Sequence, residues 1–356
     1  MNILVLGGTG AMGSPLVDIL ASCGNEVFVT SRKQRSTEKT GIHYITGNAH
    51  ELDFLTEILR ENYDAIIDFM VYSPEDFRGR IGLFLKSTKQ YFFFSSSRVY
   101  ADAGNEMITE DSPRLLDVTQ DKEYLETDEY ALAKAREENI LRQSGKNNWT
   151  IIRPYITYNN ARLQLGVLEK ESWLWRALEG KAIVFGKDIA SQYTTLTYGY
   201  DVALRVVELI GKKEALGETF HITTEESVLW QDILGIYLDV LEKKTGRKPK
   251  VCWVNDSTQF LKAVDNRYQI KYDRLFNRKF NNAKIDQFTE IMDYQKIEEG
   301  LRKCLSQFLV QSGEFMEINW RLEGAFDKVS GDKTRLKNIP GWKNRLRYIA
   351  FRYFIK

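Results

Sequence analysis

Residues 1–13 read MNILVLGGTGAMG, an apolar run that passes directly into a glycine-rich loop. The run Asn2–Leu6 has the length and composition of a strand buried on both faces of a parallel sheet. Gly7 permits a tight turn, Gly10 lets the backbone approach a pyrophosphate, and Gly13 lets the next helix pack closely while its N-terminus faces the phosphates. This order of strand, loop and helix predicts a dinucleotide site, with a tight turn without ligand as the alternative. The loop residues expected to contact the cofactor are Gly7, Thr9, Gly10, Ala11, Met12 and Gly13.

The alternation of apolar runs and helical patterns continues through the first half of the chain. Further strands are predicted at Glu26–Thr30, His43–Thr46, Ala65–Phe69, Gln90–Ser95 and Thr150–Arg153. Helices are predicted near Gly13–Cys23, Glu51–Glu61, Phe77–Ser87 and Asp128–Ser144. A last strand and helix, at Thr194–Thr197 and Asp201–Ile210, would return to the sheet. The pattern predicts an α/β fold, a Rossmann-type doubly wound parallel sheet covered by helices on both faces.

The remainder of the chain is richer in tryptophan and charge and has no second glycine loop. We therefore expect a smaller, mainly helical C-terminal substrate lobe. The predicted NAD(P)-binding Rossmann domain comprises residues 1–158 and 189–224, and the substrate lobe comprises residues 159–188 and 225–330. Residues 331–356 form a basic, aromatic C-terminal segment.

Composition and charge exclude several classes of protein. Of 356 residues 43% are hydrophobic, and fifty Lys and Arg against forty-nine Asp and Glu leave a formal charge of +1, so no overall field attracts nucleic acid. Three widely spaced cysteines and three scattered histidines have neither disulfide nor ligand spacing, so no metal is expected. We find no signal peptide and no apolar run of membrane-spanning length, and expect a soluble, cytoplasmic protein.

The end of the second strand indicates which dinucleotide is bound. An NAD site normally has a carboxylate there, which accepts hydrogen bonds from the adenosine ribose. Residues 27–33 read VFVTSRK and contain no carboxylate. Arg32 and Lys33 would neutralise a 2′-phosphate while Ser31 donates a hydrogen bond to it. NADP is therefore the expected cofactor and NAD the alternative, unless these cations are simply solvated.

A serine, a tyrosine and a lysine follow in a pattern suited to carbonyl chemistry. Tyr130 has a lysine four residues later, Lys134, and this spacing puts both on one face of a helix. Ser96 lies at the end of an apolar strand earlier in the chain. The Lys134 ammonium, with the positive charge of the nicotinamide, would favour the phenolate of Tyr130, which then exchanges a proton with a substrate hydroxyl held by Ser96. The alternative is an ordinary helix surface and a polar strand end.

Together these residues resemble the extended short-chain dehydrogenase/reductase superfamily, in particular the NAD-dependent epimerase/dehydratase family. The resemblance covers roughly residues 1–310. Its landmarks, besides the glycine loop, are SSSRVY at 95–100, YALAK at 130–134, RPY at 153–155, DVA at 201–203 and FHIT at 220–223.

The resemblance implies roles for individual residues. It places the catalytic hydroxyl on Ser96 and puts Asn48 where the family has an adenine-contacting Asp. Phe69 and Tyr72 follow the fourth strand, where the family binds the ribose and nicotinamide, although a hydrophobic rim is an alternative for both. The implied cofactor contacts beyond the glycine loop and the second strand are Asn48, Phe69, Tyr72, Tyr130, Lys134 and Pro154. The implied substrate contacts are Ser97, Arg98 and Asn159.

The chain departs from the family pattern on the substrate side. Many members that act on nucleotide sugars have an Asn two residues after the Pro that corresponds to Pro154, and an Arg before the Asp-Val-Ala segment. Here Ile156 and Thr194 stand near these positions. The sequence is therefore similar to an atypical branch of the family, which includes chloroplast stem-loop RNA-binding proteins.

These observations predict an NAD(P)-dependent epimerase or oxidoreductase that transfers a hydride and a proton at a secondary alcohol or ketone of a sugar-like substrate, nucleotide sugars included. One alternative is an NADP(H)-dependent reductase of a non-nucleotide carbonyl compound. Another is an RNA-binding or regulatory protein built on the nucleotide fold. We expect a small-molecule substrate and no nucleic acid as partner, and leave a homodimer open.

The C-terminal segment carries a charge of its own. Residues 332–356 contain eight Lys or Arg and one Asp. Apolar residues recur at helical spacing within residues 342–356, namely Trp342, Leu346, Ile349, Tyr353 and Phe354. This pattern predicts an amphipathic helix. We favour packing on its own domain or on a second subunit, because five large apolar groups need burial, over peripheral contact with an anionic membrane.

Overall fold

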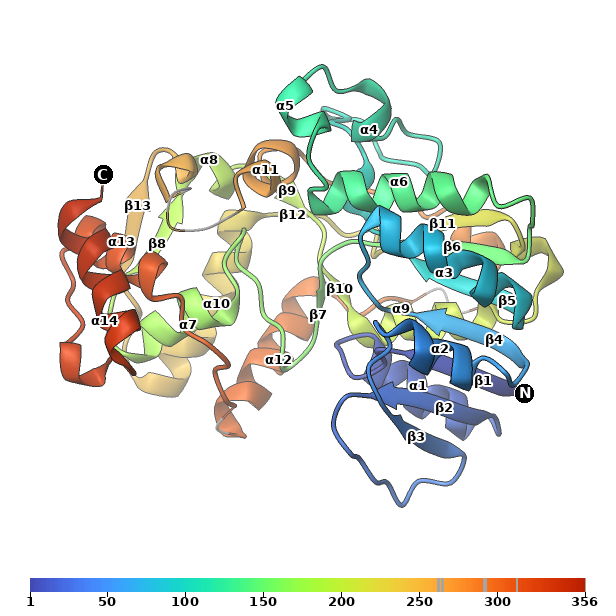
Figure 1. The fold of residues 1–356 in the computed structure, drawn as a ribbon. Coiled ribbons are helices and arrows are strands. Elements are labelled where there is room, and N and C mark those ends of the chain that lie inside the picture. The colour runs from blue at the N-terminus through green and yellow to red at the C-terminus, as the bar shows by residue number, and fades with distance from the viewer. Residues whose placement is uncertain (261–262, 264–265, 291–292, 312, 356) are drawn as a thin grey trace. The chain divides into compact units, whose positions relative to one another are not determined.

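The computed structural model describes residues 1–260, 263, 266–290, 293–311 and 313–355 (Figure 1). The chain divides into two compact units, each assembled from three separate stretches. The first unit contains Met1–Thr157, Thr195–Glu225 and Phe280–Gln295. The second unit contains Tyr158–Thr194, Glu226–Lys279 and Lys296–Lys356.

A seven-stranded parallel sheet forms the centre of the first unit. Its strands lie in the order β11-β6-β5-β4-β1-β2-β3. Their bounds are β1 Asn2–Leu6, β2 Glu26–Ser31, β3 Ile42–Thr46, β4 Tyr63–Asp68, β5 Thr88–Phe94, β6 Trp149–Pro154 and β11 Glu218–Ile222. This sheet and its flanking helices confirm the predicted Rossmann-type α/β fold. Strands β2 and β3 are added on one side of β1, and the later strands are added on the other side, beginning with β4. Sheets of this kind bind ligands at this switch point, and the glycine loop after β1 lies there.

Helices cover both faces of this sheet (Figure 1). The side chains of Ile3 and Val5 belong to one apolar cluster with helices α1 (Gly13–Ser22) and α9 (Gly199–Leu209). The alternate residues of β1 face the other cluster, with the helices α2 (Leu52–Ile58), α3 (Pro74–Lys86) and α6 (Tyr130–Arg142). Strand residues buried on both faces explain why β1 reads as an unbroken apolar run. Shorter elements of this unit are α4 (Leu115–Val118), α5 (Lys122–Leu125) and β10 (Thr197–Tyr198).

The last strand of the sheet differs from the prediction. We expected Thr194–Thr197 to return to the sheet, but its place is taken by β11. Tyr193–Thr194 instead forms β9, which pairs with β12 (Val228–Leu229) in a small antiparallel sheet of the second unit. The run of β11 contains His221, which is fully buried because Tyr100 and the Asn281 carbonyl satisfy both ring nitrogens. A polar residue inside a short apolar run interrupts the hydrophobic pattern, so a prediction based on hydrophobicity misses the strand.

The unit boundaries also differ from the prediction. Residues 280–295 were expected in the substrate lobe, but they complete the first unit. Ile285 and Phe288 join its apolar core, and the Phe288 ring packs edge-on against Phe220 at 4.8 Å between centroids. Residues 189–194, expected in the Rossmann domain, belong to the second unit. Both segments are short, and contacts with residues distant in sequence decide to which unit each belongs. Local sequence patterns contain no information about such contacts.

The second unit is mainly helical. Its longer helices are α7 (Lys170–Leu178), α10 (Trp230–Thr245), α12 (Ile297–Val310), α13 (Trp320–Ser330) and α14 (Trp342–Ile349). Short elements are β7 (Thr157–Tyr158), which begins in the first unit, α8 (Lys187–Ala190), α11 (Arg267–Gln269) and the parallel pair β8 (Ile183–Gly186) and β13 (Val251–Val254). Trp173 is fully buried in the core of this unit and stacks on Tyr237 at 4.3 Å. Within the part of the chain that the structure describes, no helix is both long and apolar enough to span a membrane.

A buried ionic network joins helices α7 and α13 in this unit. Arg176 lies 2.6 Å from Glu323 and 2.9 Å from Asp327, and all three side chains are almost completely buried. Lys181 contacts the same two carboxylates. Tyr348 of α14 donates a hydrogen bond to Asp327 at 2.7 Å. The network therefore also fixes α14 to the body of the unit.

Candidate active site

The glycine loop has the geometry of a phosphate cradle. Gly7 has a φ of +71°, a conformation that side-chain-bearing residues rarely adopt. A Cβ at Gly13 would lie 2.6 Å from the backbone of Gly8, so only glycine lets α1 start this close to β1. A Cβ at Gly10 would meet no atom within 4 Å, so this glycine leaves open space above the loop. In the first turn of α1 the Ser14 N–H donates to the Gly10 carbonyl at 3.1 Å, and the loop leads directly into the helix N-terminus, where anions bind favourably. These features fit a pyrophosphate.

The end of β2 presents three cations and a hydroxyl. Arg32 and Lys33 are exposed, and the hydroxyl of Ser31 donates to the Lys33 carbonyl at 2.8 Å. The guanidinium of Arg35 donates to the Ser31 hydroxyl at 3.3 Å. Sequence reasoning missed Arg35, although three cations within four residues were visible as a signal. The cluster fits a 2′-phosphate better than a pair of ribose hydroxyls, which would need an acceptor.

The loop after β3 is shaped by local packing. A Cβ at Gly47 would lie 2.1 Å from the Phe54 ring, so glycine is required there. The Asn48 side chain donates to Glu51 at 3.1 Å and accepts from the main-chain N–H of His50 at 3.2 Å. Asn48 is partly exposed, so an adenine contact remains a proposal.

Phe69 and Tyr72 have different surroundings. Phe69 is partly exposed directly behind the glycine loop, where a Cβ on Gly7 would lie 3.6 Å from it. Tyr72 is only 5% exposed and packs among the rings of Phe77 and Phe84. Its burial favours a packing role over the expected cofactor contact, whereas Phe69 keeps surface that a cofactor could cover.

The three serines after β5 differ in their hydrogen-bond partners. The Ser95 hydroxyl donates to Glu138 at 2.6 Å, and the Ser97 hydroxyl donates to the main-chain carbonyl of Arg153 at 2.8 Å. Ser96 Oγ accepts a hydrogen bond from the Arg98 N–H at 3.2 Å and, within the described residues, donates none. Ser96 therefore keeps a hydroxyl hydrogen for a ligand. Ser97 is fully buried and occupied, which does not support the expected substrate contact.

Tyr130 is held at the first position of α6. Glu129 caps this helix by accepting from the Ala131 N–H at 2.9 Å. Its carboxylate also pairs with Arg98 at 2.5 Å, and the Arg98 guanidinium lies 5.2 Å from the centre of the Tyr130 ring. Arg98 thus positions Tyr130 from the loop that follows β5. Tyr130 is partly exposed, as a residue that exchanges protons with a substrate must be.

Lys134 lies one turn further along α6 and is 1% exposed. Its ammonium donates to Glu137 at 2.9 Å and lies 4.6 Å from the centre of the Phe93 ring. Burial raises the pKa of Glu137 to about 7, against the opposing effect of Lys134. Burial likewise raises the pKa of Asp68 to about 6, although Asp68 accepts hydrogen bonds from Tyr91 and the Met70 N–H. Sequence reasoning missed both carboxylates, because no pattern distinguishes an inward Glu from the exposed acids of a helix.

A third buried carboxylate, Glu138, fixes the scaffold around these groups. Both of its oxygens accept hydrogen bonds from Arg153 of β6, at 2.8 and 2.6 Å. Burial opposes ionisation, but the charge of Arg153, its hydrogen bonds and Arg142 lower the pKa of Glu138 to about 2. With the Ser95 contact, this pair joins the ends of β5 and β6 to α6. The catalytic candidates are therefore built on a rigid frame.

The remaining predicted positions lie beyond β6. Pro154 is its last residue and is partly exposed. Ile156 has a φ of +20°, which is unusual for a β-branched residue. Asn159 belongs to the second unit, where its side chain accepts from the N–H groups of Ala161 and Arg162 and closes a tight turn. Among the described residues no cluster of His, Cys, Asp and Glu has the arrangement of a metal site.

The glycine loop after the first strand of the parallel sheet defines a Rossmann-type α/β fold, and Ser96, Tyr130 and Lys134 belong to the same unit as this loop. Residues 3–76 match the model of the NAD dependent epimerase/dehydratase family.

Two curated proteins are similar in sequence. The chloroplast stem-loop binding protein of 41 kDa b from Arabidopsis thaliana is 24% identical over 248 residues, which are 65% of this chain and 61% of that protein. The UDP-glucose 4-epimerase of Streptococcus mutans is 35% identical over 79 residues, 20% of this chain and 24% of that enzyme. The chain thus spans less than two thirds of the length of either relative.

The fold is shared with solved structures over most of the chain. One is a UDP-glucuronic acid 4-epimerase from Bacillus cereus in complex with UDP-4-deoxy-4-fluoro-glucuronic acid and NAD, with a TM-score of 0.65 and 16% identity. The match covers 88% of this chain and all of that one. At this identity the likeness concerns the fold.

Proposed function

We propose that this protein is an NADP-dependent enzyme that transfers a hydride and a proton at a secondary alcohol or ketone carbon of a sugar-like substrate. The main observation in support is that the three serines after β5 have different hydrogen-bond partners. Ser95 and Ser97 are used by the scaffold, and Ser96 retains a hydrogen to donate. A partly exposed Tyr130 and a buried Lys134 lie on helix α6, in the same unit as Ser96. A protein that only binds a nucleotide would not need these three groups together.

The protein groups perform the proton chemistry. The bound nicotinamide supplies the acceptor or donor of the hydride. Ser96 donates a hydrogen bond to the substrate oxygen, and Tyr130 takes or gives the proton of that oxygen. The Lys134 ammonium stabilises the phenolate that forms on Tyr130, and its pairing with Glu137 holds it in place. Arg98 and Glu129 fix the direction of the phenol.

The preference for NADP rests on charge at the end of β2. Ser31, Arg32, Lys33 and Arg35 offer donors and no acceptor carboxylate, which suits a 2′-phosphate. The family name and the bound NAD of the Bacillus cereus structure favour NAD instead. A direct comparison of the two cofactors is therefore part of the test.

The substrate class follows from the relatives only in part. The Streptococcus mutans relative acts on UDP-glucose, but its similarity is confined to a quarter of its length. Ile156, which stands where many nucleotide-sugar enzymes have an Asn, offers no polar atom to a diphosphate sugar. A sugar-like alcohol is the broader class that both facts allow, and a simple carbonyl compound is the alternative substrate.

Stem-loop RNA binding is the second candidate function. It is favoured by the Arabidopsis relative, whose similarity extends over 248 residues. Only the first candidate uses the Ser96, Tyr130 and Lys134 set. The two functions therefore make opposite predictions for a change at Tyr130.

The test measures cofactor binding and turnover in the full chain. NADPH and NADH are titrated by nicotinamide fluorescence, and nicotinamide absorbance is then followed with UDP-glucose, UDP-N-acetylglucosamine, dTDP-glucose and simple ketones. Product isomers are analysed by mass spectrometry and NMR. We expect NADPH to bind more tightly, and Tyr130→Phe to lower turnover by ~10²-fold or more while cofactor binding is unchanged. Tyr130→Phe with normal turnover, or a wild-type protein that binds an RNA hairpin and neither cofactor, would overturn the proposal.

A further inference from the structure

The C-terminal segment does not bury the apolar residues that we expected it to bury. In α14 the exposed fractions are 67% for Trp342 and 56% for Leu346, and beyond it 54% for Tyr353 and 76% for Phe354. Packing on its own domain, one of the two outcomes that we favoured, is thus wrong for these four side chains, and packing on a second subunit stays a prediction. Only Tyr348 of α14 is buried.

The helix is nevertheless firmly attached. Tyr348 bonds to Asp327 and accepts a hydrogen bond from the Thr334 N–H at 2.9 Å. A Cβ at Gly324 would lie 2.5 Å from the Tyr348 carbonyl, so α13 and α14 pack with their backbones almost in contact. The exposed face is therefore presented by a fixed helix and not by a loose end.

The exposed apolar residues form one stripe. Trp342, Leu346 and Tyr353 follow one another at spacings of four and seven, so they project from one side of the helix. Ile349 between them is partly buried against the cluster of Trp320, Ile339 and Tyr348. Tyr348 projects from a different side, toward α13. Lys343 and Arg347 are exposed beside the stripe, and Arg345 lies on its other side. We name this surface, defined by Trp342, Leu346 and Tyr353 with Lys343, Arg345 and Arg347, the terminal face.

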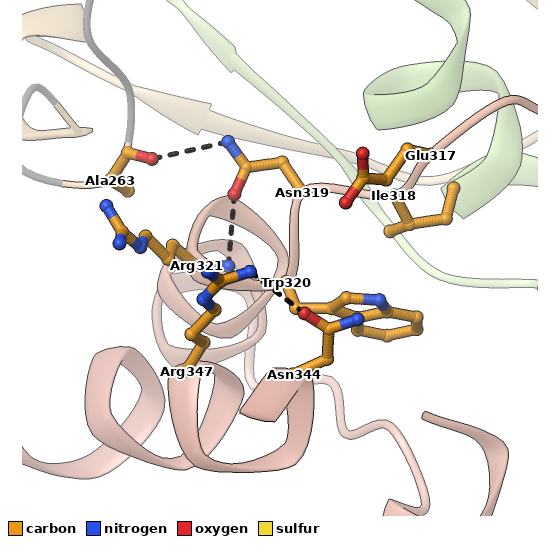
Figure 2. A pocket seen from close by; sticks show the side chains of 8 residues that line it. All are labelled: Ala263, Glu317, Ile318, Asn319, Trp320, Arg321, Asn344 and Arg347. Atoms are coloured by element: carbon orange, nitrogen blue, oxygen red, sulfur yellow. Dashed lines mark hydrogen bonds between the residues drawn. The ribbon is translucent and has the colours of Figure 1, made fainter. Parts of the chain in front are cut away.

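The charge of the segment identifies the partner. Residues 333–356 contain eight Lys or Arg and no Asp or Glu, whereas the whole chain has a formal charge of +1. A pocket of about 410 Å³ opens next to α14, lined among others by Arg321, Asn344 and Arg347 (Figure 2). The Arg347 guanidinium donates to Asn344 at 3.1 Å and so stays at this pocket. The pocket is also lined by the carboxylate of Glu317, so it does not by itself favour an anion. An apolar stripe flanked by cations is complementary to lipid headgroups above acyl chains.

We propose that the terminal face docks this protein on an anionic lipid bilayer. The stripe enters the headgroup region, with Trp342 and Tyr353 at the depth that aromatic rings prefer, and the cations pair with lipid phosphates. This inference does not depend on the proposed enzymatic function. An RNA or a second copy of the chain is the competing occupant of the same surface.

The test uses flotation of the full chain with vesicles. One set contains phosphatidylcholine alone and the other contains equal parts of phosphatidylcholine and phosphatidylglycerol. We expect the protein to float with the anionic set only, and to dissociate at high salt. The triple variant Lys337→Gln, Lys343→Gln, Arg347→Gln, in which Lys337 is an exposed cation of the same basic segment just before α14, should weaken binding on the order of 100-fold. The double variant Trp342→Ser, Leu346→Ser should weaken it at least 10-fold.

Matched controls separate this surface from general charge and folding. The triple variant Lys213→Gln, Lys243→Gln, Lys244→Gln removes as much charge from exposed positions elsewhere, and Trp253→Ser removes another exposed tryptophan. Both should float like the wild type. The charge variants and the Trp342→Ser, Leu346→Ser variant should keep the wild-type melting temperature, because their altered side chains are exposed. Trp253 also packs on Phe185, so the melting temperature of Trp253→Ser is measured to show that this control is folded.

Three results would overturn the proposal. The first is the absence of flotation by the wild type. The second is flotation that the terminal-face variants and the controls change equally. The third is a wild-type protein that does not float but binds a labelled RNA hairpin, or forms a dimer detected by light scattering, and that loses this binding or this dimer in the Trp342→Ser, Leu346→Ser variant.

Discussion

Ser96 and Ser97 are neighbours in the chain with opposite environments. The Ser96 hydroxyl has a hydrogen to offer to a ligand, whereas the Ser97 hydroxyl is fully buried and bonded to Arg153. We expect Ser96→Ala to lower turnover by ~10²-fold while its unfolding free energy changes little. Ser97→Ala should lower the unfolding free energy by about 1–3 kcal/mol, because it leaves a buried carbonyl without its donor, and should affect turnover less.

The measurement compares kcat/KM and urea unfolding for the two variants. Tyr130→Phe serves as the control for lost chemistry. Equal effects of the two serine variants on turnover would contradict the assignment of Ser96.

Glu137 is expected to make stability depend on pH. The folded protein holds the Glu137 proton up to about pH 7, whereas an unfolded glutamate loses it near pH 4.5. Between these values the folded state binds more protons, so the contribution of Glu137 to stability is complete below about pH 4.5 and decreases as the pH rises toward 7. Glu137→Gln mimics the protonated acid and removes this decrease.

The stability of Glu137→Gln relative to the wild type should therefore increase over this range, by an amount on the order of 1–3 kcal/mol. The difference is measured by urea unfolding at successive pH values, because groups that do not interact with Glu137, such as His221, titrate alike in both proteins and cancel. The exposed Glu57→Gln on α2 is the control for the loss of one carboxylate. A difference that stays constant with pH would contradict the raised pKa of Glu137.

At the scale of single residues, the sequence predicts the groups that have a fixed spacing. Tyr130 and Lys134 are four apart on one helix, and Ser96 ends an apolar strand, so their chemistry is visible without coordinates. The partners that tune them are not visible. Glu137 and Asp68 approach Lys134 from different elements, and their burial depends on how α6 packs on the sheet.

The helix α1 and its loop offer a matched pair of glycines. A Cβ at Gly13 would meet the Gly8 backbone at 2.6 Å, whereas a Cβ at Gly10 would meet nothing within 4 Å. We expect Gly13→Ala to lower the unfolding free energy by about 1–3 kcal/mol through overpacking. Gly10→Ala should leave stability unchanged or slightly higher and weaken dinucleotide binding about 10-fold or more, because its methyl group occupies the space for the pyrophosphate.

Thermal unfolding without cofactor and fluorescence titration with NADPH distinguish the two effects. Tight NADPH binding by Gly10→Ala would show that the cofactor does not approach the loop at this residue.

The end of β2 should determine cofactor choice. Arg32→Ala removes a charge-assisted contact worth about 1.5–3 kcal/mol, so the affinity for NADPH should decrease about 10- to 100-fold while that for NADH is unchanged. Arg35→Ala should act in the same direction through Ser31. Lys39→Ala, whose ammonium pairs with Asp18 at 2.7 Å on the surface, is the control. Tighter binding of NADH than of NADPH by the wild type would contradict this preference.

At the scale of elements, the fold could be predicted wherever runs were apolar and alternated with helices. Of the seven strands expected for the sheet, six correspond to β1 to β6 and are present, whereas the one expected at Thr194–Thr197 is not in the sheet. The edge strand β11 could not be predicted, because a buried His221 interrupts its apolar pattern. The return of residues 280–295 to the first unit could not be predicted either, since the packing of Phe288 on Phe220 is visible only in three dimensions.

At the scale of the second unit, the buried ionic network should determine stability. Arg176→Met would leave Glu323 and Asp327 with Lys181 as their remaining cation in this network. Removing one partner from a buried network costs about 3–5 kcal/mol, and urea unfolding should show a loss of this size. The exposed Lys243→Met is the control. A loss below about 1 kcal/mol would mean that the network contributes little net stability.

The division of the first unit into three stretches affects how the protein is made. A ribosome releases the chain from the N-terminus at ~5–20 residues per second. The sheet has no edge strand β11 until residue 222 has emerged, and its core has no Ile285 or Phe288 until later still. The residues in between belong to the second unit, so the nascent first unit must wait with part of its apolar surface uncovered. During this interval, the unfinished sheet is a substrate for chaperones that bind exposed apolar strands.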